Sequence, residues 1–239
     1  MRIDSTNSVE KQTISWPIAS AAQVVQAIDA LQAGLWIATD ADNTLWAGDV
    51  GDEVVRCAAA GTPSPWPAEL ADFDAYNRLM EDDYPRGCQH AAHLLAAVPW
   101  EQAVAQLRQG LLRQVRPRQW LVAALRRAID RGVQVVIVSA SPRPMVTLGM
   151  NLFGLDVCRV IAVDVDPSMP SRCLQPVPIG EGKVLAWQAL GLPQPSLALG
   201  DSPWDFPLLA SAQLGLLLSR ACDDPTCDVE QLSSLPSPI

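Results

Sequence analysis

The fold is decided by the stretch Leu35-Trp-Ile-Ala-Thr-Asp-Ala-Asp-Asn-Thr-Leu-Trp46. Its first part, 35–38, is a short apolar run bounded by polar residues, which predicts a buried β-strand. Asp40 and Asp42 follow at the carboxyl end of this strand. Side chains two residues apart on an extended chain point the same way, so both carboxylates can face one site. Asp and Asn also favour ordinary turns, and this stretch alone is equally consistent with a turn.

The composition indicates a globular protein with a large core. The chain has 239 residues, 49% of them hydrophobic, which is enough for an α/β domain and a smaller lobe. Its net charge is -9 and it has no Lys/Arg cluster, so nucleic acid is not an expected partner. No apolar run is long enough to span a bilayer, and the N-terminus lacks the pattern of a signal peptide. We therefore expect a cytoplasmic protein without a membrane partner, whose six scattered cysteines are reduced thiols.

Strands and helices are expected to alternate along the chain. Apolar runs predict further strands at 133–138, 159–165, 196–199 and 214–218. Helical spacing predicts helices at 19–31, 117–130, 144–153, 182–190 and 206–212. This alternation predicts an α/β fold with a doubly wound parallel sheet, in which the carboxyl ends of the strands share one edge.

A helical lobe is expected between the first two strands. The segments 68–80, 89–98 and 100–114 have helical spacing, whereas 48–67 is mixed, with a Gly-Thr-Pro-Ser-Pro-Trp-Pro loop at its end. The predicted domains are an α/β core formed by 1–48 and 115–239, and an all-helical cap formed by 49–114. The proline-rich segment 166–178 predicts an irregular excursion or a hairpin.

Polar residues also follow the second predicted strand, in Val136-Ile-Val-Ser-Ala-Ser-Pro-Arg143. Ser139 stands where the strand would lead into a helix, and the free N–H groups of a helix N-terminus bind anions. Ser139 or Ser141 could instead cap that helix. Arg143 could contact the same anion or lie in solvent.

Two later segments add charges of both signs. Lys183, one of only two lysines, follows a glycine-containing turn in Ile179-Gly-Glu-Gly-Lys183, and could bring a positive charge to a phosphate or lie on the surface. Asp201 and Asp205 flank a turn after the strand at 196–199. Mg²⁺ binds through one or two carboxylates together with a substrate phosphate, although either Asp could also cap a helix.

Taken together, the four segments resemble the haloacid dehalogenase (HAD) superfamily of phosphatases and phosphotransferases. Their order along the chain is Asp-x-Asp-x-Thr, strand-Ser, Gly-x-Gly-Lys and Gly-Asp-x-x-x-Asp. The resemblance extends over nearly the whole chain, and the helical insert is similar to the cap of the phosphoserine-phosphatase-like branch. It implies a Rossmann-like (HAD-like) core, Mg²⁺ as cofactor and a small phosphorylated substrate. The implied reaction is hydrolysis of a phosphomonoester through an aspartyl-phosphate.

The resemblance also implies catalytic roles for four residues. Asp40 would be the nucleophile, and Asp42 would protonate the leaving oxygen and later deprotonate water. Ser139 would hold a phosphate oxygen, and Lys183 would pair with Asp40 and the phosphoryl group. Attack of a carboxylate on a dianionic phosphate meets charge repulsion, which a metal ion and a lysine offset. Family members that cleave carbon–halogen bonds need no acid at Asp42, so its presence favours phosphoryl chemistry.

Metal and substrate residues follow from the same resemblance. The metal ligands would be Asp40, Asp201 and the main-chain carbonyl of Asp42, with Asp205 supporting the site or ligating directly. The residues expected to line or steady the substrate site are Thr44, Asp49, Ala140 and Ser141.

The substrate is expected to be a small phosphorylated metabolite, and an amine-bearing ester such as phosphoserine or phosphocholine is one candidate. In phosphoserine phosphatases an acidic residue near the position of Asp49 meets the substrate amine, but Asp49 could equally be a solvated charge at the hinge of the cap. Arg78 and Arg86 are candidates for binding a substrate carboxylate. Two alternatives stay open: transfer of the phosphoryl group to an alcohol, and binding of a phosphorylated ligand without turnover. The oligomeric state stays open too.

Overall fold

The computed structural model describes residues 16–60, 65–67, 71–156 and 158–220. Two of the six cysteines, at positions 222 and 227, lie outside these ranges. Four cysteines within them, Cys57, Cys88, Cys158 and Cys173, are free thiols. None of the helices in the described part of the chain is long and apolar enough to cross a membrane.

A six-stranded sheet forms the centre of the molecule, and every neighbouring pair of its strands is parallel. Its spatial order is β1 (Ile18–Ala19), β10 (Leu214–Leu218), β9 (Leu197–Gly200), β2 (Trp36–Thr39), β5 (Gln134–Pro142) and β6 (Arg159–Val163). The first strand of the sequence motif, β2, therefore lies inside the sheet between β9 and β5.

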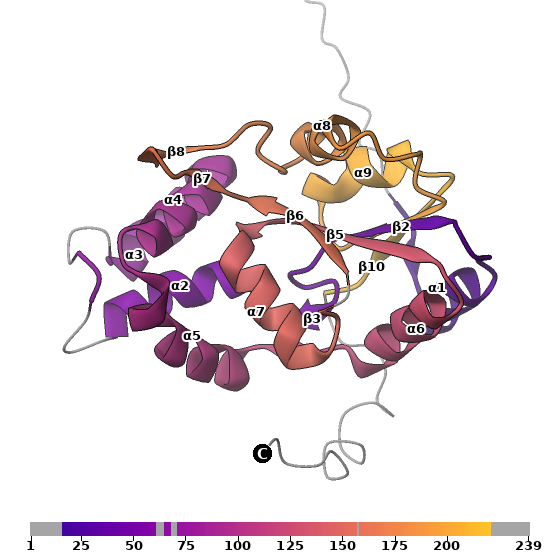
Figure 1. Ribbon diagram of the computed structural model, residues 1–239, viewed down its shortest axis with the longest axis horizontal. Coiled ribbons are helices and arrows are strands. Elements are labelled where there is room, and N and C mark those ends of the chain that lie inside the picture. Colours follow the sequence, from indigo (N-terminus) through magenta and orange to yellow (C-terminus); the bar gives the residue numbers. More distant parts are fainter. Residues whose placement is uncertain (1–15, 61–64, 68–70, 157, 221–239) are drawn as a thin grey trace, which may run out of the picture.

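Helices cover both faces of this sheet (Figure 1). One face carries α1 (Ala21–Asp29), α6 (Gln119–Asp130) and α7 (Arg143–Phe153), and the other carries α8 (Glu181–Ala189) and α9 (Phe206–Ser211). Alternate residues of β5 serve the two faces: Val135 and Ile137 join one apolar cluster, and Val136 and Val138 join the other. This period of two with apolar residues on both sides is typical of a parallel strand covered on both faces. The predicted doubly wound α/β fold is confirmed.

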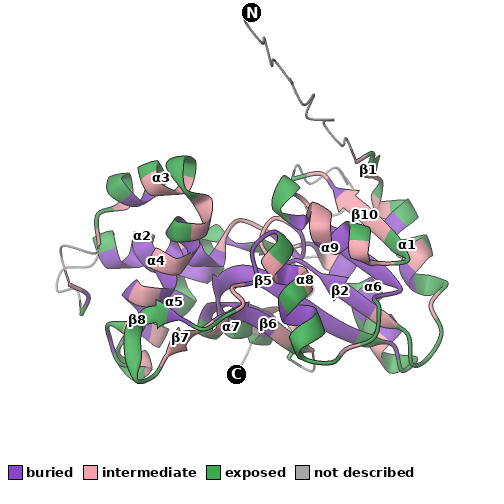
Figure 2. Cartoon of the chain, turned by 90° about the horizontal axis from the view of Figure 1, so that it is seen from above, coloured by how far each residue is buried: buried purple, intermediate pink, exposed green. Residues whose placement is uncertain are grey.

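Four helices follow β2 and lie beside the sheet rather than over it (Figures 1 and 2). They are α2 (Val50–Ala60), α3 (Phe73–Asp82), α4 (Tyr84–Ala96) and α5 (Trp100–Gln114). The chain enters them through β3 (Trp46–Ala47) and leaves through β4 (Arg116–Pro117), and these two short strands pair antiparallel. The entry and exit of the insert are therefore held side by side.

The first helix of the insert adds to the sequence analysis, which found only a mixed pattern at 48–67 and assigned no helix there. Val50, Val54 and Ala58 are buried along one face of α2 at helical spacing. Gly51 in the first turn lowers the helix propensity at its start. The side chain of Asp49 stabilises the start of the helix, because its Oδ1 accepts hydrogen bonds from the N–H groups of Gly51 and Asp52.

The second corrected segment is β5, which was expected to end at Val138. The strand continues to Pro142, with an irregular register against β6 between Val138 and Pro142. Ser139 thus lies inside the strand and does not open a helix. The capping alternative for Ser139 and Ser141 is also wrong, because the N-cap of α7 is Pro142 and makes no side-chain cap bond.

The proline-rich segment contains a hairpin. β7 (Val165–Asp166) and β8 (Met169–Cys173) pair antiparallel, which confirms the hairpin alternative for 166–178. β8 also packs against α4 of the insert, where the side chains of Ala92, Val163 and Cys173 form a small apolar cluster.

Replacement of Leu125 on α6 by Ala is expected to lower the free energy of unfolding by about 2–5 kcal/mol, since the side chain is fully buried in the main core. Leu112→Ala on α5 is the matched control, because Leu112 is 52% exposed and its loss is expected to cost less than about 0.5 kcal/mol. Urea unfolding measures both. Equal costs for the two variants would contradict the placement of α6 against the sheet.

Candidate active site

A polar cavity of about 210 Å³ lies at the carboxyl end of the central strands, where the insert meets the core. Asp40, Asp42, Lys183, Asp201 and Asp205 all line it. Three segments that are distant in the sequence therefore meet at one place, as the strand-edge argument predicts. Two of the predicted substrate residues, Asp49 and Ala140, line the cavity as well. The other predicted residues, Thr44, Ser139 and Ser141, lie just behind its wall, bonded to residues that line it.

A buried ion triplet joins three of these segments. Lys183 Nζ lies 2.6 Å from Asp40 Oδ1 and 2.5 Å from Asp205 Oδ1. Only 2% of the Lys183 side chain is exposed, and a cation this buried is stable only when it is paired. Burial by itself lowers the pKa of Lys183, but the carboxylates of Asp205 and Asp40 together outweigh it and raise the pKa. Burial raises the pKa of Asp40 well above its usual range, and Lys183 opposes this shift.

Asp205 also organises the loop after β9. Its Oδ2 accepts hydrogen bonds from Asp201 N (3.1 Å), Ser202 N (3.0 Å) and Ser202 Oγ (2.8 Å). A Cβ atom on Gly200 would lie only 2.4 Å from Asp205 Cβ, so this close approach requires glycine. The loop is therefore fixed before any ligand binds.

Thr44 connects two carboxylates across the site. Its Oγ1 is 3.1 Å from Asp40 Oδ2 and 3.0 Å from Asp201 Oδ1. Carboxylate oxygens of Asp40, Asp201 and Asp205 all lie within 4.8 Å of one another. Hard oxygen donors at this spacing suit a divalent cation such as Mg²⁺. Burial, and next the charge of Asp205, raise the pKa of Asp201.

Asp42 faces a different set of partners. Its Oδ1 accepts hydrogen bonds from Trp46 Nε1 and Val50 N, each at 2.8 Å. Its Oδ2 accepts one from Ser141 Oγ at 2.7 Å, with Ser139 Oγ at 3.4 Å. Burial raises the pKa of Asp42, and the hydrogen bonds from Ser141, Val50 and Trp46 oppose the shift. The side chain is thereby held at the start of the insert rather than among the three clustered carboxylates.

The second motif is arranged differently from the expectation. Ser139 is fully buried, and its Oγ accepts the N–H of Ser141 at 3.0 Å. Arg143 neither faces the cavity nor lies free in solvent, because it binds both oxygens of Asp164 at 2.8–2.9 Å.

Apart from Asp49, the wall that the insert contributes was not predicted. It is formed by Asp52 from α2, Met80 from α3 and Tyr84 from α4. Asp52 Oδ1 accepts a hydrogen bond from Tyr76 OH at 2.8 Å, and burial raises the pKa of Asp52 against the opposing effects of Tyr76 and Arg56. No local motif marks these residues, because only the packing of the helices brings them to the site.

The insert and core close over the cavity through two aromatic rings. Tyr84 at the start of α4 stacks on Trp204 of the 3-10 helix η2 (Pro203–Asp205), with ring centroids 5.0 Å apart and planes inclined by 18°. Below them Cys88 packs against Ala140 and Ile179. The cavity is therefore enclosed by contacts between the two parts of the chain.

Burial raises the pKa of Asp49 well above its usual range, and the charges of Asp42 and Asp52 add to the shift. Arg78 and Arg86, the two candidates for a substrate carboxylate, are exposed and do not line the cavity.

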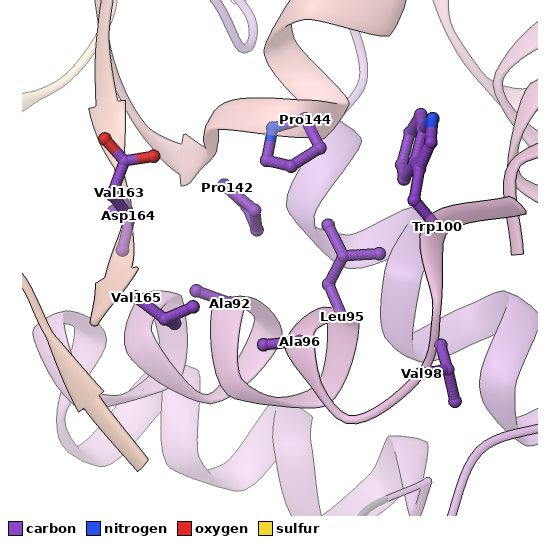
Figure 3. A pocket seen from close by; sticks show the side chains of 10 residues that line it. All are labelled: Ala92, Leu95, Ala96, Val98, Trp100, Pro142, Pro144, Val163, Asp164 and Val165. Atoms are coloured by element: carbon purple, nitrogen blue, oxygen red, sulfur yellow. The ribbon is translucent and has the colours of Figure 1, made fainter. Parts of the chain in front are cut away.

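A second cavity, of about 240 Å³, lies between α4 and the ends of β5 and β6 (Figure 3). Ala92 and Leu95 on α4 face Pro142 and Pro144 across it. Among its described lining residues the one carboxylate, Asp164, is bound to Arg143. This apolar cavity lacks the charged groups that phosphoryl chemistry needs.

Known structures share this architecture. A protein of unknown function from Bordetella pertussis Tohama I is 20% identical with a TM-score of 0.61, over 78% of this chain and 90% of that one. A substrate-bound phosphoserine phosphatase is 17% identical with a TM-score of 0.54, over 82% and 90% of the two chains. A phospho-aspartyl intermediate analogue of phosphoserine phosphatase is 18% identical with a TM-score of 0.51, over 78% and 87%. At these identities the likeness establishes the fold.

A search of curated proteins gave no match. The family model for haloacid dehalogenase-like hydrolases matches residues 37–210, which include Asp40, Asp42, Lys183, Asp201 and Asp205. The match covers most of the chain and confirms the resemblance drawn from the motifs. The chain belongs to the haloacid dehalogenase-like hydrolase family.

Proposed function

We propose that this chain is a Mg²⁺-dependent phosphatase, which hydrolyses a small phosphomonoester through an aspartyl-phosphate on Asp40. The observation that carries the proposal is the contact of Asp40 with Lys183 inside an enclosed cavity that also holds Asp42 and Asp201. The likeness to two known structures, a phosphoserine phosphatase and a phospho-aspartyl intermediate analogue of phosphoserine phosphatase, supports it. The free thiols described above suit a reducing compartment such as the cytoplasm.

In the first step Asp40 attacks the phosphorus atom, the P–O bond to the leaving group breaks, and an acyl phosphate forms. A carboxylate and a phosphate dianion repel each other, and the Lys183 ammonium group offsets part of this repulsion from 2.6 Å away. Bound Mg²⁺ would supply further positive charge at the phosphoryl oxygens. Asp40, Asp201 and the main-chain carbonyl of Asp42 would hold it, and Asp205 would support the loop, since both of its oxygens already accept hydrogen bonds.

Asp42 would move the protons. It must be protonated when the leaving oxygen departs, and its burial favours that form. Once ionised, it would take a proton from the water that hydrolyses the acyl phosphate, which restores Asp40. Ser139 and Ser141 would orient the Asp42 carboxyl through the hydrogen bonds they direct at its Oδ2. In the same proposal Ser139 holds a phosphate oxygen, and helices 49–114 act as the cap.

The leaving group would carry an amine. The insert side of the cavity presents Asp52 and the nearby Asp49, an aromatic ring at Tyr84 and a thioether at Met80. No basic side chain from the described part of the insert lines the cavity. An ammonium group would be attracted there by the carboxylates and by the face of the Tyr84 ring, and this holds for a quaternary ammonium as well, whereas a carboxylate such as that of phosphoserine would be repelled. Phosphocholine or a similar amine ester therefore fits better than phosphoserine.

Replacement of Asp40 by Asn is expected to lower the Mg²⁺-dependent release of p-nitrophenol from its phosphate ester by about 1,000-fold or more, because the nucleophile is lost. Asp130→Asn is the matched control, since Asp130 is exposed at the end of α6 and should leave the rate unchanged. Acid quenching with a radiolabelled ester should trap label on the wild-type chain and none on D40N. A D40N rate equal to that of the wild type would refute the mechanism.

Replacement of Asp52 or Asp49 by Asn is expected to lower kcat/KM for phosphocholine and phosphoethanolamine by about tenfold or more, because a charged partner of the amine is lost. The rate on p-nitrophenyl phosphate, which has no amine, should change much less. Asp82→Asn, at an exposed position on α3, serves as the control. If both variants keep the wild-type ranking of amine, phosphoserine and neutral esters, the amine proposal fails while the phosphatase proposal stands.

A further inference from the structure

Each carboxylate of the proposed metal cluster is already paired with a basic side chain of the same protein. Lys183 binds Asp40 and Asp205 at 2.6 and 2.5 Å. Arg220 Nε lies 2.7 Å from Asp201 Oδ2. The pair of Arg220 with Asp201 has no counterpart in the motifs that identify the family, and it requires its own explanation.

The two basic side chains differ in their freedom to move. Lys183 is 2% exposed and lies between two buried carboxylates, so it is confined to the site. Arg220, two residues after the end of β10, is 63% exposed at the edge of the same cavity. An ion pair with one exposed partner is weak, because water competes for the guanidinium group. Arg220 can therefore leave its carboxylate at low cost.

The position of Arg220 is nevertheless built into the fold. Arg118, which is buried, donates from Nη2 to the carbonyl oxygens of Ser219 (2.6 Å), Arg220 (3.2 Å) and Asn43 (3.0 Å). These bonds fasten the backbone at Arg220 to the loop that carries Asp40. The backbone is fixed while the side chain remains at the surface.

Asp201 does not depend on Arg220 for its orientation. Its Oδ1 accepts a hydrogen bond from Thr44, its main-chain N–H binds Asp205 Oδ2, and its side chain is only 3% exposed. Loss of Arg220 would therefore remove a positive charge beside Asp201 and leave the carboxylate in place.

We propose that Arg220 is a displaceable counter-ion that competes with the divalent cation for Asp201 and thereby weakens metal binding. This inference rests on the metal dependence in the proposed function. Without metal the guanidinium group balances the Asp201 carboxylate, which lies close to two further carboxylates. When the cation binds, the repulsion between like charges drives the Arg220 side chain outward.

The test is calorimetric titration of the full chain with Mg²⁺ alone, after treatment with EDTA. We expect Arg220→Gln to bind Mg²⁺ about 3- to 30-fold more tightly than the wild type at low ionic strength, and the gain to shrink as salt is added. Arg220→Lys keeps the charge and should stay closer to the wild type. Arg86→Gln removes the same charge from an exposed position outside the cavity and should change the affinity by less than about twofold.

Thermal unfolding gives a second readout that does not depend on activity. The rise in Tm at a fixed Mg²⁺ concentration should be larger for R220Q than for the wild type, because stabilisation by a ligand increases with its affinity. If folded R220Q binds Mg²⁺ as tightly as the wild type or more weakly, the inference about Arg220 is overturned while the proposed metal dependence stands. That result would indicate that Arg220 helps to position Asp201. Absence of Mg²⁺ binding in both proteins would overturn the proposed metal dependence together with this inference.

Discussion

The buried charge of Lys183 is the constraint on which the site depends. A lysine with 2% exposure is tolerated only with anionic partners, and removal of the lysine would leave two carboxylates in the interior without their counter-charge. Those partners, Asp40 and Asp205, follow β2 and β9, while Lys183 opens α8. One ammonium group thus connects three segments that are far apart in the sequence, and it places the nucleophile candidate next to the positive charge that its reaction requires.

A second network connects this chemistry to the insert. Asp42 accepts the N–H of Val50, the first residue of α2, and the indole N–H of Trp46 in β3. The loop that carries the proposed acid and base is therefore bonded to the hinge of the helices that enclose the cavity. On the opposite rim the stacked rings of Tyr84 and Trp204 join the same two parts of the chain. The insert is therefore joined to the core both at Asp42 and at the Tyr84–Trp204 pair.

The sequence predicted those features that rest on local pattern or on the strand-edge rule. The strand at 214–218 and the helix at 100–114 have the predicted bounds, and the motif carboxylates meet Lys183 at the expected edge. It missed α2, whose first turn contains a glycine, and it ended β5 too early because polar residues continue that strand. Asp52 and Tyr84 reach the cavity only through the packing of the insert, which local periodicity does not encode. Arg220 follows a strand end, so the strand-edge rule could have identified it.

The pairing of β3 with β4 has a consequence for how such a protein can diversify. Trp46 lies opposite Pro117 and Ala47 opposite Arg116, so the two connections between core and insert form one narrow neck. Insertions are tolerated where the chain ends of the inserted unit lie close together, because the host backbone need not move. The helices beyond this neck could therefore be replaced by another inserted unit while the α/β core stays unchanged. Selectivity can evolve on one side of the neck while the reaction chemistry is retained on the other.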